Sequence, residues 1–387
     1  MPCINKDKLI YLKTYDNVKE SIVIPSSIGL FAKQDSTYDF FYIQFSMPDS
    51  FKHFPISEIV PSDVLEKIKN KKIFLVLDNA LEYFLHSVDG IYNDIVYKEH
   101  IPPEQIIFLT ATPNMNEYVK KYSELNNVEQ IKVDWFSLFE ATGKDACAGS
   151  QIACTVKNKT KKFLNLNRRW RLHRPLLLTL LYDRGLLDQG HVSFAPSDDG
   201  KDWNAAYRQM LQVYSNDKNI LPILERNESI KNLQPMYLDT NDLVTNRAVH
   251  EDTINEYYYD SYFSVVNETT YHEGVPFLSE KIFKTIALGH PFILVSVPHS
   301  LQYLKQLGYK TYSEIINEDY DTIEDNGLRM LAIVDEIERL TKLEGKKLKR
   351  WISKTQEIAK YNRSKIIRKQ YADLSKPMNY IHHFKAS

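Results

Sequence analysis

Three charged residues, Glu280, Lys281 and Lys284, follow a position that suits a helix N-cap. That position is Ser279, and Gly289 stands where the left-handed residue after a helix belongs, so the sequence predicts a short helix between them. A helix N-terminus offers free amides and partial positive charge to phosphate, and the two lysines add full charge. A carboxylate beside a diphosphate suits the two hydroxyls of a ribose. The group predicts a nucleotide-diphosphate site, with a Glu280–Lys284 helix salt bridge as the simpler alternative.

A second candidate is the basic segment NRRWRLHR, which comes directly after a predicted strand. Guanidinium groups bind diphosphate bidentately, and such cations stabilise a departing nucleoside diphosphate where no metal ion does so. A solvated basic loop, or a nucleic-acid contact with the tryptophan as a stacking face, is the alternative. We assign Arg168, Arg169 and His173 to the donor phosphates, and Arg171 and Arg174 to the acceptor.

The loop NETTYHEG follows the apolar run YFSVV, so it also lies at the carboxyl end of a predicted strand. Glu268, Thr269 and Glu273 are candidates for hydrogen bonds to sugar hydroxyls, and Gly274 permits close backbone approach. His272 is interpreted as a surface loop histidine.

A general base that deprotonates an acceptor hydroxyl is expected from the first half of the chain. Asp78 ends the run IFLVLD and is the first choice, ahead of Asp134 and Glu82. An Asp at a strand end also commonly caps the next helix, which is the simpler interpretation. A mechanism that retains the sugar configuration needs no such base.

These residues must be positioned by α/β elements, because short apolar runs alternate with helical patterns along most of the chain. Strand, helix and strand in succession predict parallel, doubly wound sheets, preceded by a small β-rich addition before about residue 65. The predicted strands are IFLVLD, QIIFLT, IKVDWF, KKFLNLNR, HVSFA, YFSVVNE and PFILVS.

With 387 residues the chain is too long for one ordinary core, and the pattern dissolves into small polar residues at 143–160. We expect an acceptor-side domain over 1–150, a nucleotide-sugar domain over 151–345 and a basic helical extension over 346–387. Apolar residues recur in the extension at helical spacing, so one face should be buried. Its basic face is either merely solvated or guides a polyanionic acceptor.

Bulk composition is that of a folded globular protein, with 43% hydrophobic residues, 26% charged residues and a net charge of -1. Near-neutral charge does not favour non-specific nucleic-acid binding. The sequence has three cysteines and no CxxC pair, and it shows no signal peptide and no membrane-spanning run. These features predict a soluble cytoplasmic protein. No P-loop, GxGxxG, HExxH or GxSxG motif occurs, and no metal site is expected; the acidic run DYDTIED is interpreted as a helix start or surface segment.

The stretch LSEKIFKTIALGHPFILVSVPHSLQYLKQLGYKTY resembles the donor-site region of GT-B glycosyltransferases, in particular glycosyltransferase-like proteins of large DNA viruses and tailed phages. The segment FLNLNRRWRLHRPLLLTLLYDRGLLD is also similar to that group. The resemblance implies two Rossmann-like domains and a C-terminal helix that crosses back to the first. It places Glu280 on the donor ribose, with Lys281 or Lys284 and the pair Arg168 and Arg169 on the diphosphate.

The resemblance implies a hexosyl- or pentosyltransferase that moves a sugar from a nucleotide-diphosphate sugar to a hydroxyl, without metal or cofactor. The acceptor is a glycan, protein or lipid-linked hydroxyl. One alternative is a hydroxymethylated pyrimidine in DNA, flipped into the site. Another is a non-catalytic protein that binds nucleotide sugars or nucleic acid. A viral protein of this kind would act in the host cytoplasm, and the oligomeric state is left open.

Overall fold

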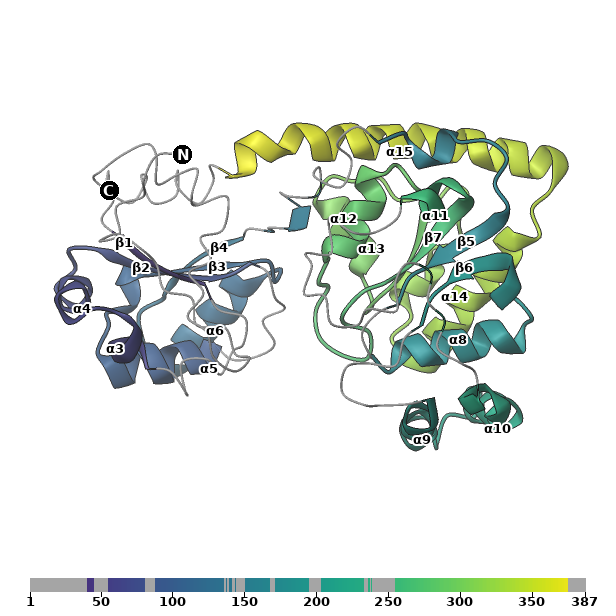
Figure 1. Cartoon of the computed structure of the whole chain (residues 1–387). Helices are drawn as coiled ribbons and strands as arrows, with labels where there is room; N and C mark the ends of the chain where they lie inside the picture. The colour runs from purple at the N-terminus through teal and green to yellow at the C-terminus, as the bar shows by residue number, and fades with distance from the viewer. Residues whose placement is uncertain are drawn as a thin grey trace. The chain divides into compact units, whose positions relative to one another are not determined.

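The computed structural model describes residues 40–44, 55–80, 88–135, 137, 139–140, 143, 150–167, 171–194, 203–232, 236, 238 and 255–374. The chain divides into two compact units (Figure 1). Unit 1 comprises Met1–Ala141 and Gln370–Ser387, and unit 2 comprises Thr142–Lys369.

Unit 1 is built on a parallel sheet in the order β1-β2-β3-β4. The strands are β1 Phe40–Gln44, β2 Phe74–Asn79, β3 Ile106–Thr110 and β4 Lys132–Trp135. The three strands predicted here are confirmed. The β-rich addition is wrong in one respect, because the run YDFFYIQFSM supplies β1, which pairs in parallel with β2. An alternating apolar pattern is the same for a strand of the main sheet as for a separate hairpin.

The helical elements of unit 1 are α3 Ile56–Ile59, α4 Ser62–Lys69, α5 Val88–Ile91, the π-helical turn η2 Tyr92–Tyr97, η3 Pro103–Gln105 and α6 Met115–Asn126. They supply a core with the inward faces of the strands, including Ile56, Leu75 and Phe108. Tyr92 lies in this core, and its hydroxyl donates to the Glu129 carbonyl at 2.8 Å.

Unit 2 also holds a parallel sheet, in the order β6-β5-β7-β8. Its strands are β5 Lys161–Asn165, β6 Gly190–Val192, β7 Ser261–Asn267 and β8 Phe292–Val295, so all four predicted strands are confirmed. The chain passes from β5 to β6 on one side and later returns to place β7 on the other side of β5. Strand order therefore reverses between β5 and β7. The described strands of unit 1 run in one direction without such a reversal.

The α-helices that lie wholly in unit 2 are α8 His173–Asp183, α9 Trp203–Val213, α10 Leu221–Arg226, α11 Glu256–Tyr259, α12 Glu280–Ala287, α13 Ser300–Gln306 and α14 Asn326–Thr341. Helix α15, Gly345–Leu374, begins in unit 2, and its residues from Gln370 onward are assigned to unit 1. Short 3₁₀ turns are η5 Ala153–Thr155, η6 Leu187–Gln189, η7 Glu228–Asn232 and η8 Asp319–Thr322.

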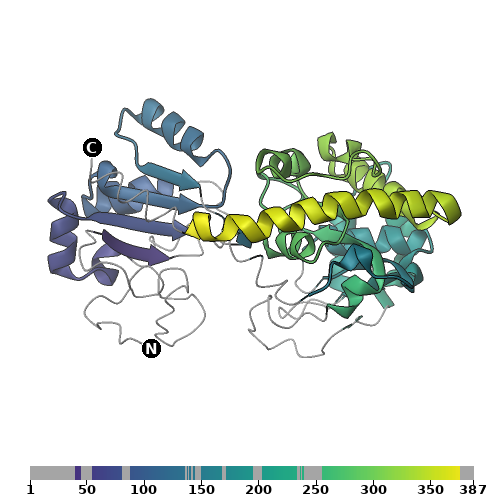
Figure 2. The same ribbon diagram turned by 90° about the horizontal axis from the view of Figure 1, so that it is seen from above.

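Helix α15 is the predicted basic extension, and Figure 2 shows it lying over unit 2. Trp351 packs edge-on against Phe263 of β7, with ring centroids 6.2 Å apart. Farther along, Asn362 exchanges two hydrogen bonds with the backbone of Lys310, and Arg363 donates to the Ser150 carbonyl at 2.8 Å. The predicted buried face is confirmed, and these contacts place it against unit 2.

Candidate functional site

The reversal of strand order in unit 2 marks where a ligand is expected. In open parallel sheets, ligands bind beyond the carboxyl ends of the two strands at which the order reverses. Here those strands are β5 and β7, and the segments that leave them lead to α8 and α12. The candidate site is this edge of unit 2.

Buried asparagines join the carboxyl ends of these two strands. The Asn267 side-chain amide donates to Asn167 Oδ1 at 2.7 Å, and Asn165 Nδ2 donates to the Val265 carbonyl at 2.8 Å. All three asparagines are at most 3% exposed. Asn267 Oδ1 accepts no hydrogen bond from the residues that the structure describes. Sequence analysis missed this cluster, although an asparagine recurs where the predicted strands FLNLN and VVNE end.

Glu268 links the loop after β7 to the start of α12. It is fully buried, and its carboxylate accepts hydrogen bonds from the backbone nitrogen of Ser279, at 3.1 Å, and from the Ser279 hydroxyl. Burial raises the pKa of Glu268, while Lys281 and Ser279 oppose that rise. The sequence assigned Glu268 to sugar hydroxyls. In the structure both carboxylate oxygens instead hold the cap residue of α12.

The start of α12 is built as the sequence predicts. Ser279 is the N-cap and its hydroxyl accepts from the backbone nitrogen of Lys281, while Gly289 follows the helix at φ +66°. Lys281 Nζ lies 3.0 Å from Glu280 Oε1, and both side chains keep some exposure, 28% and 13%. Lys284 is different, because it is buried and its Nζ lies 5.9 Å from the Tyr258 ring centroid. Of the two lysines, Lys281 is the one at the helix N-terminus.

His173 begins α8 and is 2% exposed. Its Nε2 lies 3.1 Å from the Glu268 carbonyl and its ring stacks on Tyr271, with centroids 5.2 Å apart. Burial, helped by the charge of Arg174, holds the pKa of His173 well below its usual value. The ring is therefore neutral and donates from Nε2. It joins α8 to the loop after β7 but lends no positive charge, which corrects the assignment of His173 as a member of a cationic phosphate clamp.

Arg329, on α14, binds the loop that follows β7. Sequence analysis missed this residue. It is 1% exposed, donates to the Tyr271 carbonyl and to Asn326 Oδ1 at 2.6 Å each, and stacks on the Tyr271 ring at 4.4 Å. Within the described part of the chain no carboxylate lies within ion-pair distance of it. His272 is half-buried and bonded to the Tyr214 hydroxyl at 2.9 Å; burial and the Arg329 charge lower the pKa of His272 to about 4. Arg329 and Tyr271 are 58 positions apart in the sequence, so no local sequence pattern could predict their contact.

The basic segment after β5 is only partly covered by the structure. Arg168 and Arg169 lie outside the described residues. Arg171 is exposed, whereas Arg174 is 4% exposed in the first turn of α8. Only Arg171 of the two predicted acceptor residues therefore faces solvent. Thr269 is half-buried beside Glu268.

Asp78 stands near the end of β2 in unit 1 and is 6% exposed. Its Oδ1 accepts from the backbone nitrogen of Ala80 at 2.7 Å, so the carboxylate stabilises the turn that follows the strand. Asp134 is half-buried in β4, and Glu82 lies outside the described residues.

The acidic run DYDTIED serves helix starts, as predicted. Asp321 accepts from the backbone nitrogens of Leu301 and Gln302 in α13, at 2.9 and 3.1 Å, and Asp325 caps α14 through Leu328 at 2.8 Å. Among the described residues there is no group of three His, Cys, Asp or Glu arranged to hold a metal ion. None of the helices described is both long and apolar enough to cross a bilayer.

Comparison with known proteins gives distant likenesses. No protein-family profile matches the chain, and no curated protein matches it. A crystal structure of the GtfA/B complex aligns with a TM-score of 0.42 at 11% identity, covering 98% of this chain and 64% of that one. An α,α-trehalose-phosphate synthase (UDP-forming) from Burkholderia vietnamiensis aligns with a TM-score of 0.38 at 12% identity, covering 90% and 74%. The chain thus spans 64% of the length of the first of these structures.

Proposed function

We propose that this protein is a glycosyltransferase of the GT-B type, which moves a sugar from a nucleotide-diphosphate sugar to a hydroxyl acceptor. The proposal is carried by one observation. The Ser279-capped start of α12, with Glu280 and Lys281, follows the strand β7 at which the order of the unit 2 sheet reverses.

Each group at this edge has a chemical task in the proposal. Backbone amides of α12 and the Lys281 ammonium bind the diphosphate and stabilise the charge that develops on it as the sugar departs. The Glu280 carboxylate accepts hydrogen bonds from the ribose hydroxyls. Arg168 and Arg169 add charge to the phosphates in place of a metal ion.

The surrounding residues would keep this arrangement in place. Glu268 and His173 connect the loop after β7 to α12 and α8, so the binding groups come from two helices tied through buried hydrogen bonds. Asn267 Oδ1 is a buried acceptor at the strand ends and suits a donor group of the ligand. In the inverting form of the reaction, Asp78 would act as the general base for the acceptor hydroxyl.

Nucleotide binding tests the proposal. UDP or another nucleoside diphosphate should raise the melting temperature in the presence of EDTA, and a panel of nucleotide sugars should identify the base. Glu280→Ala should weaken binding by about 1–3 kcal/mol, the loss expected for charged hydrogen bonds, as measured by calorimetry. Lys281→Ala should weaken it as well.

Matched variants separate this effect from a general change of charge. Glu324→Ala and Lys305→Ala remove exposed charges from the same unit and should leave nucleotide affinity unchanged. Unchanged affinity in Glu280→Ala would remove Glu280 from the site, and a strict requirement for Mn²⁺ would contradict metal-independent transfer.

A further inference from the structure

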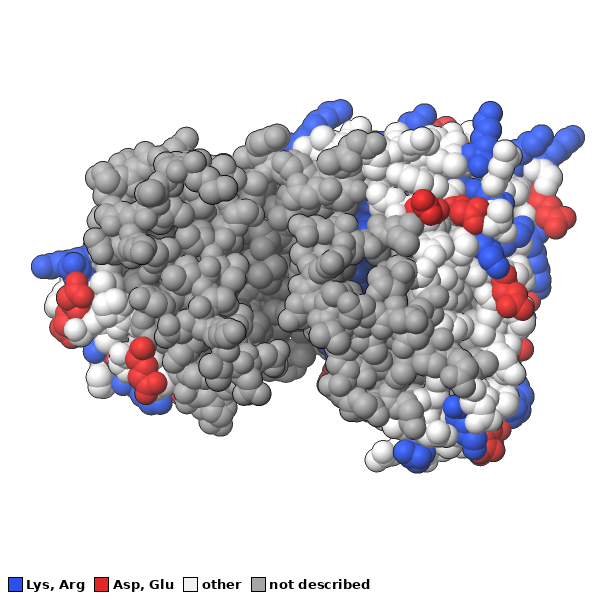
Figure 3. Space-filling model, in the orientation of Figure 1, with Lys and Arg blue, Asp and Glu red and all other residues white. Residues whose placement is uncertain are grey.

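A cluster of exposed cations begins α15. Lys346, Lys347, Lys349 and Arg350 are all exposed, and the first turn of the helix contains no acidic residue. Figure 3 shows Lys and Arg side chains standing out at the upper right, where α15 starts. Cations at a helix N-terminus oppose the helix dipole, so this cluster contradicts a local rule of helix stability. Such contradictions are expected at functional sites.

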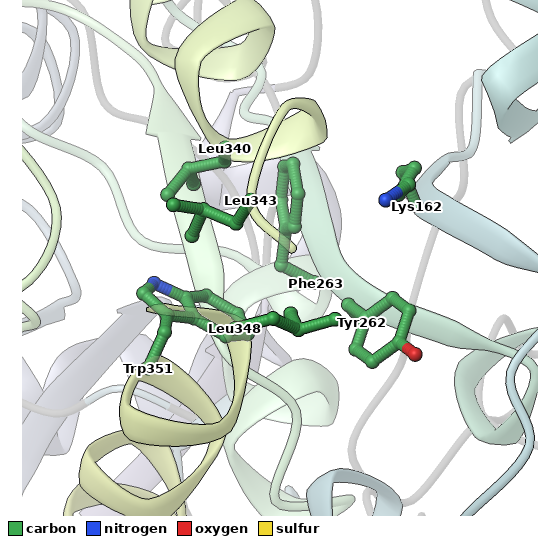
Figure 4. Close-up of a pocket in the computed structure, with 7 residues that line it drawn as sticks. All are labelled: Lys162, Tyr262, Phe263, Leu340, Leu343, Leu348 and Trp351. Atoms are coloured by element: carbon green, nitrogen blue, oxygen red, sulfur yellow. The ribbon is translucent and has the colours of Figure 1, made fainter. Parts of the chain in front are cut away.

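An apolar notch lies beside this cluster. Leu348 and Trp351 of α15 face Leu343, in the turn before the helix, and Phe263 of β7, with Lys162 at the side (Figure 4). Trp351 is 5% exposed, and its indole nitrogen donates to no acceptor among the residues described. The Trp351 ring and its nitrogen are thus enclosed, and the apolar surface that reaches solvent beside the cations is that of the half-buried Leu343 and Leu348.

The remaining basic residues of α15 are less available. Lys354 pairs with Glu314 at 3.6 Å, Arg363 donates to backbone carbonyls, and the Lys365 ammonium lies 5.3 Å from the Tyr309 ring. Lys360 and Arg368 are exposed farther along. Positive charge is thus densest at the start of the helix.

From these features we propose that the start of α15, with the α14–α15 turn, docks on an anionic membrane surface. Lipid phosphates and carboxylates match the four cations, and the acyl boundary matches the half-buried side chains of Leu343 and Leu348.

Nucleic acid fits the same surface less well. Single strands bind along an extended basic track with exposed aromatic stacking faces. The exposed Tyr361 ring is instead occupied by the Lys310 ammonium, 4.5 Å from its centroid, and the cations are gathered at one end of the helix.

The docking surface is separate from the nucleotide site proposed above. Lys162 and Tyr262 are the second residues of β5 and β7, so the notch lies at the amino ends of these strands. The candidate nucleotide site lies at their carboxyl ends. Changes at the docking surface should therefore leave nucleotide binding intact, and failure of one proposal does not imply failure of the other.

Vesicle co-sedimentation of the full chain tests the docking surface. The parent protein should sediment at low salt with phosphatidylcholine vesicles that contain phosphatidylserine, and not with phosphatidylcholine alone. K346Q/K347Q/K349Q/R350Q should lower the partition coefficient about several hundredfold, since each cation near an anionic surface contributes about fivefold. Leu348→Gln, which makes a half-buried apolar side chain polar, should lower it severalfold.

A control of equal charge decides whether position matters. K67Q/K72Q/K120Q/K121Q removes four exposed cations from unit 1 and should keep full vesicle binding. Equal loss in this control, or no binding by the parent to anionic vesicles, would overturn the proposal. The proposal would also be overturned if the parent protein did not bind vesicles but bound duplex DNA through Lys346 to Arg350. Melting temperatures confirm that each variant is folded.

Discussion

At the scale of single residues, buried Glu268 makes Ser279 an unusual helix cap. Its hydroxyl accepts from the α12 backbone as an ordinary cap does, but the same hydroxyl donates to the Glu268 carboxylate. A cap that only accepts hydrogen bonds cannot make both contacts. The identity of this residue is therefore more restricted than the general preference for Ser, Thr, Asp and Asn at this position.

Two substitutions of Ser279 should separate these requirements. Ser279→Ala should lower the free energy of unfolding by about 0.5–2 kcal/mol, the usual loss of a cap. Ser279→Asp should be at least as damaging, although Asp caps well elsewhere, because it brings a second carboxylate against Glu268 in a buried place. Denaturant unfolding measures both, and an Asp variant as stable as the parent would refute the proposed restriction.

At the scale of elements, α8 and α12 each end on a left-handed glycine, and the two glycines have different surroundings. Gly289 after α12 has φ +66° and Gly185 after α8 has φ +64°. A Cβ at Gly289 would lie 2.6 Å from Ile152 Cγ2, whereas one at Gly185 would meet nothing within 4 Å. An alanine at either position would therefore be destabilised by the left-handed backbone. Only at Gly289 would its Cβ also clash with a neighbouring side chain.

Gly185→Ala should cost about 1–2 kcal/mol of stability, the penalty for a left-handed alanine. Gly289→Ala should cost clearly more, because Ile152 must move. In a double-mutant cycle, Ile152→Ala should recover part of the loss at Gly289 and none at Gly185. Equal losses for the two glycines would show that the Ile152 contact is relieved without cost.

At the scale of the whole molecule, unit 2 should be sensitive to acid. Burial lowers the pKa of His290 to about 3 and of His272 to about 4, and it lowers that of His173 as well. At these three histidines the unfolded chain therefore binds more protons than the folded chain below about pH 6.5. The contribution of these histidines to the free energy of unfolding should be fully present above that pH. It should fall as the pH drops, by about 1 kcal/mol per histidine at about pH 5.5.

Melting curves between neutral and mildly acid pH measure this slope. His290→Gln should reduce the slope by about one histidine's share, because one buried imidazole is removed. A pH-independent melting temperature in the parent would show that the buried rings already bind protons when folded.

Much of this fold could be predicted from the sequence, because the information was local. Apolar runs between turn residues gave the strands, and Ser279 with Gly289 gave the limits of α12. The residues that hold the site in place could not be predicted. Arg329 contacts Tyr271 from a distant part of the sequence, and the burial of Glu268 depends on the packing of other elements. A charged residue at a strand end looks the same in sequence whether it binds ligand or a neighbouring cap.

The loop after β7 is anchored mainly through its backbone. Arg329 binds the carbonyl of Tyr271, and Asn326 Nδ2 donates to the carbonyl of His272 at 3.2 Å. Carbonyl groups are present whichever side chain a position carries. The exposed position that follows, Glu273, can therefore exchange residues over evolutionary time without loosening the anchor, whereas Gly274, at φ +107°, favours glycine. Under the proposed function, substitution at this exposed position can change selectivity for the sugar while the residues that anchor the loop stay the same.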